Sequence, residues 1–349
     1  MNRTVAIEDV LQAKETWQII DVRSPAEYTT GHIPGAINIP LFNDEERASV
    51  GTLYKQDSPE VALHKGLEYA GAKMADLVKS IKSQGSTSEK KILIHCWRGG
   101  KRSQAVHWLT SFSGVETTLL IGGYKQYRRA LHDFFDSLET PLHILGGCTG
   151  SGKTEVLYAL QELGEQMVDL EKLAHHKGSA FGGIGETRQP STEQFENDLF
   201  EAFRVLDSKV PIWLENESKS IGRVYIPDAL WHKMRASQLF TIQVDRDIRL
   251  QRAIKYYADV KDTQILKSAF DKIKKRLGGL GYQQALDALE KGELNQAASI
   301  ALEYYDKSYT FQLSHWVEGK STVMEPCDNV HDTAIQLKRA SDEMIREYT

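Results

Sequence analysis

The chain has little of what stabilises secreted proteins or anchors proteins in membranes. Its 349 residues contain only three cysteines, Cys96, Cys148 and Cys327, which cannot all pair and whose spacing matches no zinc-binding pattern. No apolar run approaches the roughly 20 residues that span a bilayer, and the first six residues lack the apolar stretch of a secretory signal. We therefore expect no disulfide framework, no structural metal, no membrane partner and a cytoplasmic location.

A large excess of charge of either sign is also absent. The 43 lysines and arginines are set against 48 aspartates and glutamates, which gives a net charge of −5. Binding to nucleic acid depends on a local basic patch, however, and not on total charge. Residues 246–276 hold ten lysines and arginines and four aspartates. Charge alone favours a solvated helical face for this stretch, and a docking surface for RNA is the alternative.

The length of the chain exceeds what one hydrophobic core normally serves, so we expect two domains. In the first, short apolar strands at 17–22, 91–95 and 118–121 alternate with segments of helical period. Ser103 to Thr110 is one such segment, and in another the apolar positions recur at steps of three and four, at Leu67, Ala70, Met74, Leu77 and Ile81. Strands alternating with helices are typical of a parallel α/β sheet.

A polar connector that ends at Pro141 separates the two halves. We place a first domain at residues 1–136 and a second at 141–349. Apolar segments in the second domain predict strands at 142–145, 211–215 and 239–245. The pattern is mostly helical from about residue 246 onward, so we expect a second α/β domain with a helical C-terminal region.

The strand at 91–95 runs directly into a cysteine loop, His95-Cys96-Trp97-Arg98-Gly99-Gly100-Lys101-Arg102-Ser103. The thiolate is the reactive form of cysteine, and backbone N–H groups at a helix N-terminus stabilise it. Glycines let such a loop curl closely, an arginine can hold an oxyanion bidentately, and a serine suits the first helical turn. We interpret Cys96 as a nucleophile and Arg102 as an anion-holding catalytic residue. The remaining residues are expected to form the loop that binds the substrate anion: Trp97, Arg98, Gly99, Gly100, Lys101 and Ser103. The alternative, a buried structural cysteine, is disfavoured by the glycines and the arginine.

A second anion-binding motif follows the strand at 142–145. Residues 147–154 read Gly-Cys-Thr-Gly-Ser-Gly-Lys-Thr, a complete G-x-x-x-x-G-K-[ST] phosphate loop between an expected strand and an expected helix. Its backbone N–H groups would cradle two linked phosphates, Lys153 would neutralise them, and Thr154 could bind Mg²⁺. The predicted diphosphate site consists of Gly147, Gly150, Ser151, Gly152, Lys153 and Thr154. Glu215 and Asp169 are candidates for an acidic partner of the metal, and the motif favours pyrophosphate binding over ATP hydrolysis.

The first half resembles the rhodanese homology domain. The resemblance is carried by Asp21-Val22-Arg23-Ser24-Pro25-x-Glu27-Tyr28, by Gly31-His32-Ile33-Pro34-Gly35-Ala36, by the cysteine loop, and by Gly122-Gly123-Tyr124. It implies that Cys96 carries a chalcogen atom as a persulfide. Single-domain rhodaneses usually have four residues between the cysteine and the arginine, whereas Cys96 and Arg102 are separated by five. This wider spacing also occurs in cysteine phosphatases and suits a tetrahedral anion, so phosphoester hydrolysis is the alternative for this domain.

A rhodanese-like domain joined to a phosphate-loop domain resembles the tRNA 2-selenouridine synthase family over nearly the whole chain. Motifs of the second half agree, among them Gln189-Pro190, Phe195-Glu196-Asn197, Trp213-x-Glu215-x-Glu217-Ser218 and Tyr304-Tyr305-Asp306. The resemblance implies an enzyme, a transferase, that acts on the wobble 2-thiouridine of tRNA. A geranyl group from geranyl diphosphate is first placed on sulfur, and selenium from selenophosphate then replaces the S-geranyl group.

Roles for residues follow from this resemblance. Cys96 would carry selenium while Arg102 and the loop hold the phosphate group, and the phosphate loop would hold the diphosphate of the geranyl donor. Phosphates of the tRNA would contact the basic stretch at Arg246, Arg249, Arg252, Lys255, Lys274, Lys275 and Arg276. Tyr256 and Tyr257 could stack on an unpaired base, with packing in the core as the favoured alternative for at least one of them. We expect no tightly bound cofactor, and Mg²⁺ only as an optional ion. A kinase that uses the phosphate loop and a regulatory rhodanese-like binding module are two further functions to weigh, and the oligomeric state is left open.

Overall fold

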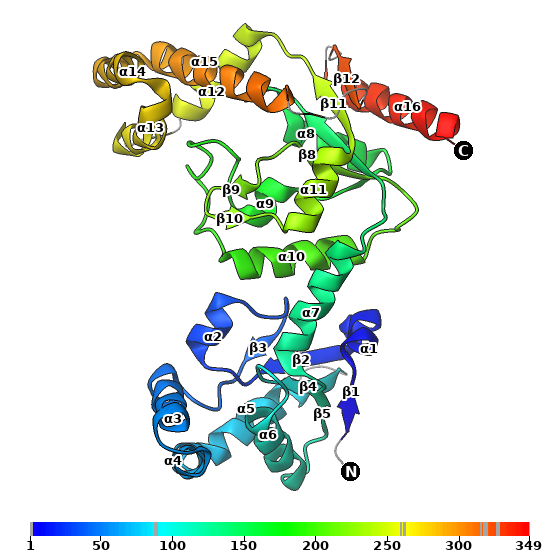
Figure 1. Cartoon of the computed structure of the whole chain (residues 1–349), viewed down its shortest axis with the longest axis vertical. Helices are drawn as coiled ribbons and strands as arrows, with labels where there is room; N and C mark the ends of the chain where they lie inside the picture. Colours follow the sequence, from blue (N-terminus) through cyan, green and yellow to red (C-terminus); the bar gives the residue numbers. More distant parts are fainter. Residues whose placement is uncertain are drawn as a thin grey trace. The chain divides into compact units, whose positions relative to one another are not determined.

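The computed structural model of the chain describes residues 3–86, 90–258, 260, 263–314, 316, 320–325 and 329–348. Cys327 lies outside this part. The chain forms two compact units: unit 1 comprises residues 1–137 and 196–201, and unit 2 comprises residues 138–195 and 202–349. Both are α/β units built on a parallel sheet, as predicted (Figure 1). None of the described helices is long and apolar enough to cross a membrane.

Unit 1 is a five-stranded parallel sheet with strand order β1-β5-β4-β2-β3. Its strands are β1 (Thr4–Val5), β2 (Trp17–Asp21), β3 (Ile37–Asn38), β4 (Lys91–His95) and β5 (Thr117–Leu120). Its helices are α1 (Ile7–Gln12), the 3-10 turn at Lys14–Thr16, α2 (Pro25–Thr30), α3 (Asp44–Gln56), α4 (Pro59–Gly71), α5 (Met74–Ser86), α6 (Lys101–Phe112) and α7 (Gly123–Asp136). The buried core under α5 and α6 includes Ile20, Ile81, Ile94 and Val106. The central strand β4 is apolar on both faces, as a strand inside a parallel sheet must be.

The apolar repeat from Leu67 to Ile81 is split between two helices, which corrects the single helical segment expected from the sequence. Helix α4 ends at Gly71 and α5 begins at Met74. Gly71 is a poor helix former, and Leu67 is exposed whereas Leu77 and Ile81 are buried. The apolar positions of the repeat therefore lie on two separate helices, and they do not form one continuous apolar face.

Unit 2 is a second five-stranded parallel sheet, with strand order β12-β11-β6-β8-β7, and a separate two-stranded hairpin. Its strands are β6 (Leu142–Gly146), β7 (Gln166–Met167), β8 (Ile212–Glu215), β9 (Ser220–Ile221), β10 (Val224–Tyr225), β11 (Gln238–Ile242) and β12 (Ser321–Met324). Its helices are α8 (Lys153–Glu162), α9 (Leu170–Ala174), α10 (Thr192–Arg204), α11 (Asp228–Ala236), α12 (Arg246–Ala258), α13 (Thr263–Leu277), α14 (Gly279–Lys291), α15 (Leu294–Leu313) and α16 (Val330–Tyr348). Six residues of α10 are counted with unit 1.

Two clusters of apolar side chains among the described residues form much of the core of unit 2. One lies between the sheet and helices α8 and α16, with Trp213, Phe240, Leu157 and Leu337 among its buried side chains. The other holds helices α12 to α15 together and includes Phe270 and Leu289. The long helical stretch predicted after residue 246 is thus a helical subdomain with its own core (Figure 1).

Candidate active site

The cysteine loop begins where the central strand of unit 1 ends. Strand β4 pairs with β2 on one side and β5 on the other, and its last residue is His95. Cys96 follows, and helix α6 starts at Lys101 after the N-cap residue Gly100. Loops at the carboxyl ends of parallel strands are where ligands bind in open α/β sheets. The sequence prediction placed Cys96 at this position.

Ser103 is the polar side chain that contacts the Cys96 sulfur. The Cys96 Sγ and Ser103 Oγ atoms are 3.2 Å apart, and the same hydroxyl donates to the Gly100 carbonyl at 3.1 Å. Both Cys96 and Ser103 are buried. Ser103 lies in the first turn of α6, one of the two positions that the sequence suggests for it. Its hydroxyl also lies against the sulfur, and by turning away from the Gly100 carbonyl it can donate its single proton to a thiolate.

The Gly122-Gly123 turn holds the cysteine loop from the other side. The backbone N–H groups of Tyr124 and Lys125, in the first turn of α7, donate to the carbonyls of Cys96 and Trp97 at 2.9 and 2.8 Å. Gly123 has a φ of +61°, and a Cβ there would lie 2.3 Å from the Cys96 carbonyl oxygen. Only glycine fits, so this motif shapes the loop directly.

Arg102 is engaged by a carboxylate outside the loop. Its Nη1 and Nη2 atoms donate to the Glu27 carboxylate at 2.5 and 3.1 Å, and Arg47 Nε lies 3.5 Å from the same group. Burial alone would raise the pKa of Glu27, but hydrogen bonds and attraction from Arg102 outweigh it and lower that pKa below its usual value. An oxyanion in the loop would have to compete with Glu27 for Arg102.

A buried ion pair lies beneath the loop, and the sequence interpretation gave its residues no role. Arg23 is 1% exposed, donates through Nε to both oxygens of Asp21 at 3.0 and 2.9 Å, and lies 4.0 Å from the centre of the Tyr124 ring. His95 Nε2 lies 3.8 Å from Asp21 Oδ2, and burial lowers the pKa of His95. The Asp21-x-Arg23 spacing in the rhodanese-like motif was the sequence signal for this ion pair.

The phosphate loop of unit 2 has the predicted strand–loop–helix context. Strand β6 lies between β11 and β8, and helix α8 begins at Lys153. Gly147, Gly150 and Gly152 have φ values of +155°, +81° and +83°, so the glycine spacing of the motif is required by the backbone. Lys153 Nζ donates to the Gly147 carbonyl at 3.1 Å. The Lys153 side chain therefore lies across the loop whose bound phosphates it is expected to neutralise.

Two arginines of the expected tRNA-contacting stretch contact the phosphate loop. Arg249 is 6% exposed, forms a bidentate ion pair with Asp306 at 2.8 and 2.9 Å, and donates to the Thr149 carbonyl at 3.3 Å. Arg252 donates to the Gly150 carbonyl at 3.1 Å. The charge pattern predicts Arg249 on an exposed face, whereas in the structure its side chain is buried and paired with Asp306. A count of charges contains no information on burial, so it could not predict this.

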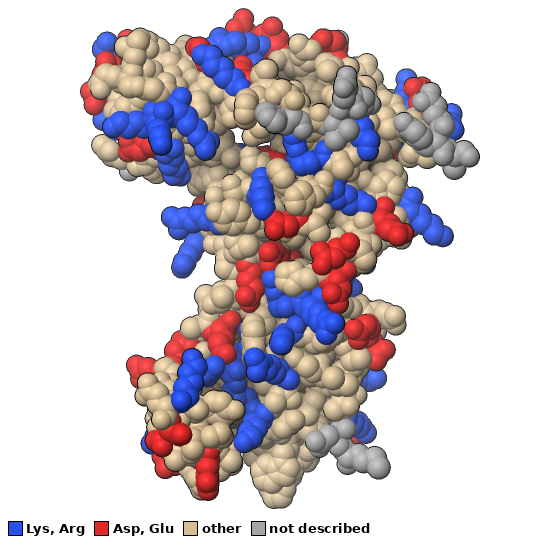
Figure 2. All heavy atoms as spheres, in the orientation of Figure 1, with Lys and Arg blue, Asp and Glu red and all other residues tan. Residues whose placement is uncertain are grey.

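The other five cationic residues of that stretch are exposed. Arg246 donates to the Ser299 hydroxyl at 2.8 Å, Lys274 lies 4.6 Å from the centre of the Tyr282 ring, and a hydrogen bond to Tyr304 raises the pKa of Arg276. Lys and Arg side chains gather over the α13–α14 part in Figure 2. The side chains of Tyr256 and Tyr257 lie outside the described residues, and contact with tRNA stays a prediction.

Acidic side chains gather beside the phosphate loop, at the ends of β7 and β8. Glu215 is fully buried; its Oε2 accepts from the Leu170 N–H at 3.1 Å, and its Oε1 has no hydrogen-bond partner among the described residues. Asp169 caps helix α9 by accepting from the Lys172 N–H. Burial and repulsion from Asp169 and Glu171 raise the pKa of Glu215.

Glu171 and Glu217, which the sequence interpretation did not assign to the metal, complete this acidic group. Thr154 Oγ1 donates to Glu171 at 3.4 Å. Burial and the neighbouring Glu171 raise the pKa of Glu217 to about 8. The sequence signal was the Glu215-x-Glu217 repeat after the strand. Across the described ranges, no group of three or more His, Cys, Asp or Glu residues has an arrangement able to hold a metal ion.

Comparisons with known proteins assign both units to the domain types that the sequence predicts. The family model of the tRNA 2-selenouridine synthase AAA domain matches residues 140–336, and that of the rhodanese-like domain matches residues 7–130. A tRNA 2-selenouridine synthase of Nitrosomonas europaea is 33% identical over 340 residues, covering 83% of this chain and 88% of the relative. Those of Shewanella denitrificans and Marinobacter nauticus are 33% and 36% identical, each over 85% of this chain and 88% of its own length. The chain belongs to the tRNA 2-selenouridine synthase family.

Proposed function

We propose that this chain is an enzyme that converts the wobble 2-thiouridine of tRNA into 2-selenouridine in two stages, geranylation and then selenation. One observation carries the proposal: a cysteine loop at a strand end and a complete phosphate loop occur in separate units of one chain of this family. The order of the stages makes chemical sense. A thiocarbonyl sulfur is a poor leaving group, whereas its S-alkylated form leaves as a thiol and makes carbon 2 electrophilic.

The phosphate loop would serve the first stage. The 2-thio sulfur attacks the first carbon of the geranyl group, a carbon–sulfur bond forms, and the carbon–oxygen bond breaks with its electron pair leaving on diphosphate. Lys153 and the N–H groups around Gly150 and Gly152 can neutralise that leaving group. Thr154 and Glu171 would supply oxygen ligands if Mg²⁺ binds with the diphosphate.

The cysteine loop would serve the second stage. The Cys96 thiolate attacks the selenium of selenophosphate. A sulfur–selenium bond forms, and the selenium–phosphorus bond breaks with its electron pair leaving on phosphorus, which is thereby reduced and released as phosphite. Ser103 can donate to the Cys96 sulfur, and Arg102 can bind the phosphate group after release from Glu27. The carried selenium then displaces geranylthiol from carbon 2, and an external thiol supplies the two electrons that separate selenium from Cys96.

Mass spectrometry of nucleosides tests the proposal. The wild-type chain is incubated with tRNA that contains wobble 2-thiouridine and geranyl diphosphate, and then with selenophosphate. We expect an S-geranyl nucleoside after the first step and 2-selenouridine after the second. An unchanged wobble nucleoside in both steps would contradict the tRNA assignment.

Phosphoester hydrolysis is a second candidate because the five residues between Cys96 and Arg102 also suit a cysteine phosphatase. Hydrolysis of an aryl phosphate that depends on Cys96 would favour it. ATP consumption with stoichiometric phosphorylation of a small substrate would instead favour a kinase built on the phosphate loop.

A further inference from the structure

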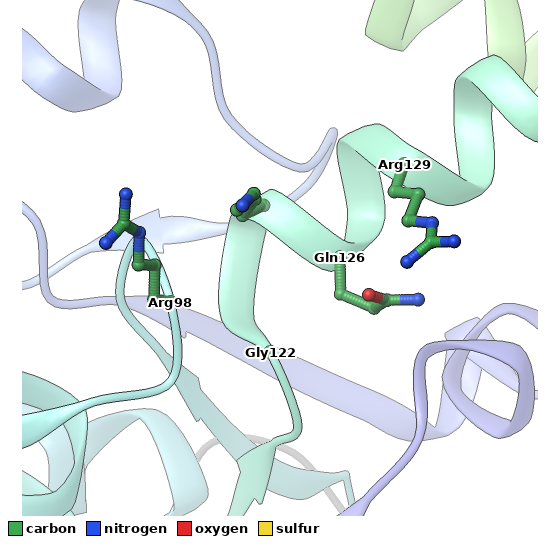
Figure 3. A pocket seen from close by; sticks show the side chains of 5 residues that line it. Arg98, Gly122, Gln126 and Arg129 are labelled. Carbon is green, nitrogen blue, oxygen red and sulfur yellow. The ribbon is translucent and has the colours of Figure 1, made fainter.

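A small cationic pocket lies beside the cysteine loop in unit 1. Its volume is about 250 Å³, and it is lined by Arg98 of the loop and by Gly122, Lys125, Gln126 and Arg129 of the turn and helix α7. Figure 3 shows Arg98 on the loop and Gln126 and Arg129 on successive turns of the helix. Pockets for drug-sized apolar ligands usually measure about 300–1,000 Å³. This one is smaller and its lining is cationic, which suits a single phosphate group and not a geranyl chain.

The pocket gathers positive charge that the protein leaves uncompensated. No carboxylate lines it, and neither Arg98 nor Lys125 has an ion-pair partner within the described part of the chain. Arg129 has only a 3.7 Å contact with Asp133, and both side chains are largely exposed, so that pair is weak. Lys125 and Arg129 are four residues apart and share one face of α7. Like charges held together in this way repel one another, and a bound anion would relieve the repulsion.

The turn and helix that line the pocket also hold the cysteine loop, so the pocket lies close to Cys96. The first-turn N–H groups of α7 already donate to the carbonyls of Cys96 and Trp97, so they cannot form a backbone nest for a small dianion. Gly122 has a φ of +73°, and a Cβ there would lie 2.8 Å from the Cβ of Gln126. The position therefore favours glycine, which leaves this side of the pocket without a side chain. The Arg98 Cα can lie at most about 7.6 Å from that of Cys96, because consecutive Cα atoms are about 3.8 Å apart.

We propose that this pocket binds a phosphodiester group of the RNA backbone next to the nucleotide whose base reaches Cys96. Long, exposed arginine and lysine side chains without a backbone nest are the groups that proteins use for contacts with nucleic-acid phosphates irrespective of sequence. The inference rests on the proposed function, since it assumes that Cys96 acts on an RNA base. It adds an RNA contact in unit 1, separate from the basic stretch of unit 2.

The test is the salt dependence of RNA binding by the full chain. The probe is a labelled anticodon stem-loop with wobble 2-thiouridine, titrated by fluorescence anisotropy between about 50 and 200 mM salt. The pocket variant is Lys125→Gln/Arg129→Gln, and the matched control is Lys55→Gln/Lys79→Gln, which removes the same charge from exposed positions of α3 and α5 in unit 1. Thermal unfolding checks that both variants fold.

We expect the pocket variant to bind RNA roughly tenfold more weakly. The slope of log K against log salt should fall by about 0.7–0.9 for each phosphate that the variant no longer neutralises, whereas the control should keep the wild-type slope. Arg98→Gln should weaken binding in the same direction. Wild-type affinity and slope in the pocket variant would overturn the proposal while leaving the proposed function intact. A rise in the KM for selenophosphate with unchanged RNA binding would assign the pocket to the small donor and would also overturn it. Failure of the wild-type chain to bind the RNA would reject the RNA substrate and the pocket together.

Discussion

The Glu27–Arg102 pair restrains the arginine that the proposed chemistry of the cysteine loop needs for holding an anion. Arg102 was predicted as an anion-holding residue, and in the structure both of its terminal nitrogens bind Glu27. Glu27 also accepts from the Ser24 N–H and closes the capping box of α2. One carboxylate therefore both caps a helix and restrains the arginine of the loop.

Replacing Glu27 with Gln should release Arg102 without disturbing the helix. Glutamine also serves as the third residue of a capping box, so α2 is retained, but the attraction of a full carboxylate for Arg102 is removed. We expect the KM for selenophosphate to fall by about threefold to tenfold, since a partly exposed ion pair contributes about 1 kcal/mol. An unchanged KM, with far-UV circular dichroism confirming the helix, would show that Arg102 does not leave Glu27 during the reaction.

The raised pKa of Glu217 makes the stability of unit 2 depend on pH. Its ordinary value is 4.5, and burial beside Glu171 raises it to about 8, so the folded state binds more protons than the unfolded state between these pH values. The free energy of unfolding should therefore fall as the pH rises from about 4.5 to about 8.

Glu217→Gln removes this carboxyl group and should flatten the dependence. We expect the variant to have a Tm above that of the wild type at pH 8 and a smaller difference at pH 5, as measured by differential scanning calorimetry. A parallel pH profile for the two proteins would mean that Glu217 titrates normally in the folded state.

At the scale of elements, the ion pair between α12 and α15 supports the phosphate loop. Arg249 on α12 binds Asp306 on α15 and the Thr149 carbonyl, and Arg252 binds the Gly150 carbonyl. The helical subdomain thereby fixes the far side of the loop that precedes α8. The Tyr304-Tyr305-Asp306 motif has a structural explanation here, because Tyr305 also accepts from the Ala180 N–H at 2.7 Å.

Arg249→Lys should weaken the binding of geranyl diphosphate. Lysine keeps the charge but cannot bind Asp306 bidentately and reach Thr149 at once. We expect affinity to fall by about tenfold or more in isothermal titration calorimetry, together with a lower Tm. Arg246→Lys, at an exposed position on the same helix, is the control and should leave both unchanged. Equal effects of the two variants would argue against a specific role of the Arg249 contacts in stabilising the phosphate loop.

The same elements show what the sequence could and could not predict. The two parallel sheets, the strand ends that carry the loops and the helical C-terminal region all follow from apolar periodicity and from complete local motifs. The burial of Arg249, the gathering of Glu171 and Glu217 near Thr154 and the capture of Arg102 by Glu27 depend on contacts between residues far apart in the chain. No local sequence pattern encodes such contacts. For this reason the charge count predicted that all arginines of α12 lie on one exposed face, although Arg249 is buried.

At the scale of the whole molecule, the two proposed stages are assigned to different units. Unit 1 contains the cysteine loop and the cationic pocket, and unit 2 contains the phosphate loop, its acidic group and the exposed basic stretch. This division means that each stage should fail separately when its own loop is altered. Lys153→Ala should abolish the first stage, because it removes the cation expected to neutralise the diphosphate.

The most direct test of this account is nucleoside mass spectrometry on the Cys96→Ala variant, supplied with geranyl diphosphate and selenophosphate together. We expect S-geranyl-2-thiouridine to accumulate to the amount that the wild type forms from geranyl diphosphate alone, and no 2-selenouridine to form. Full conversion to 2-selenouridine by Cys96→Ala would contradict the role of Cys96 as the selenium carrier.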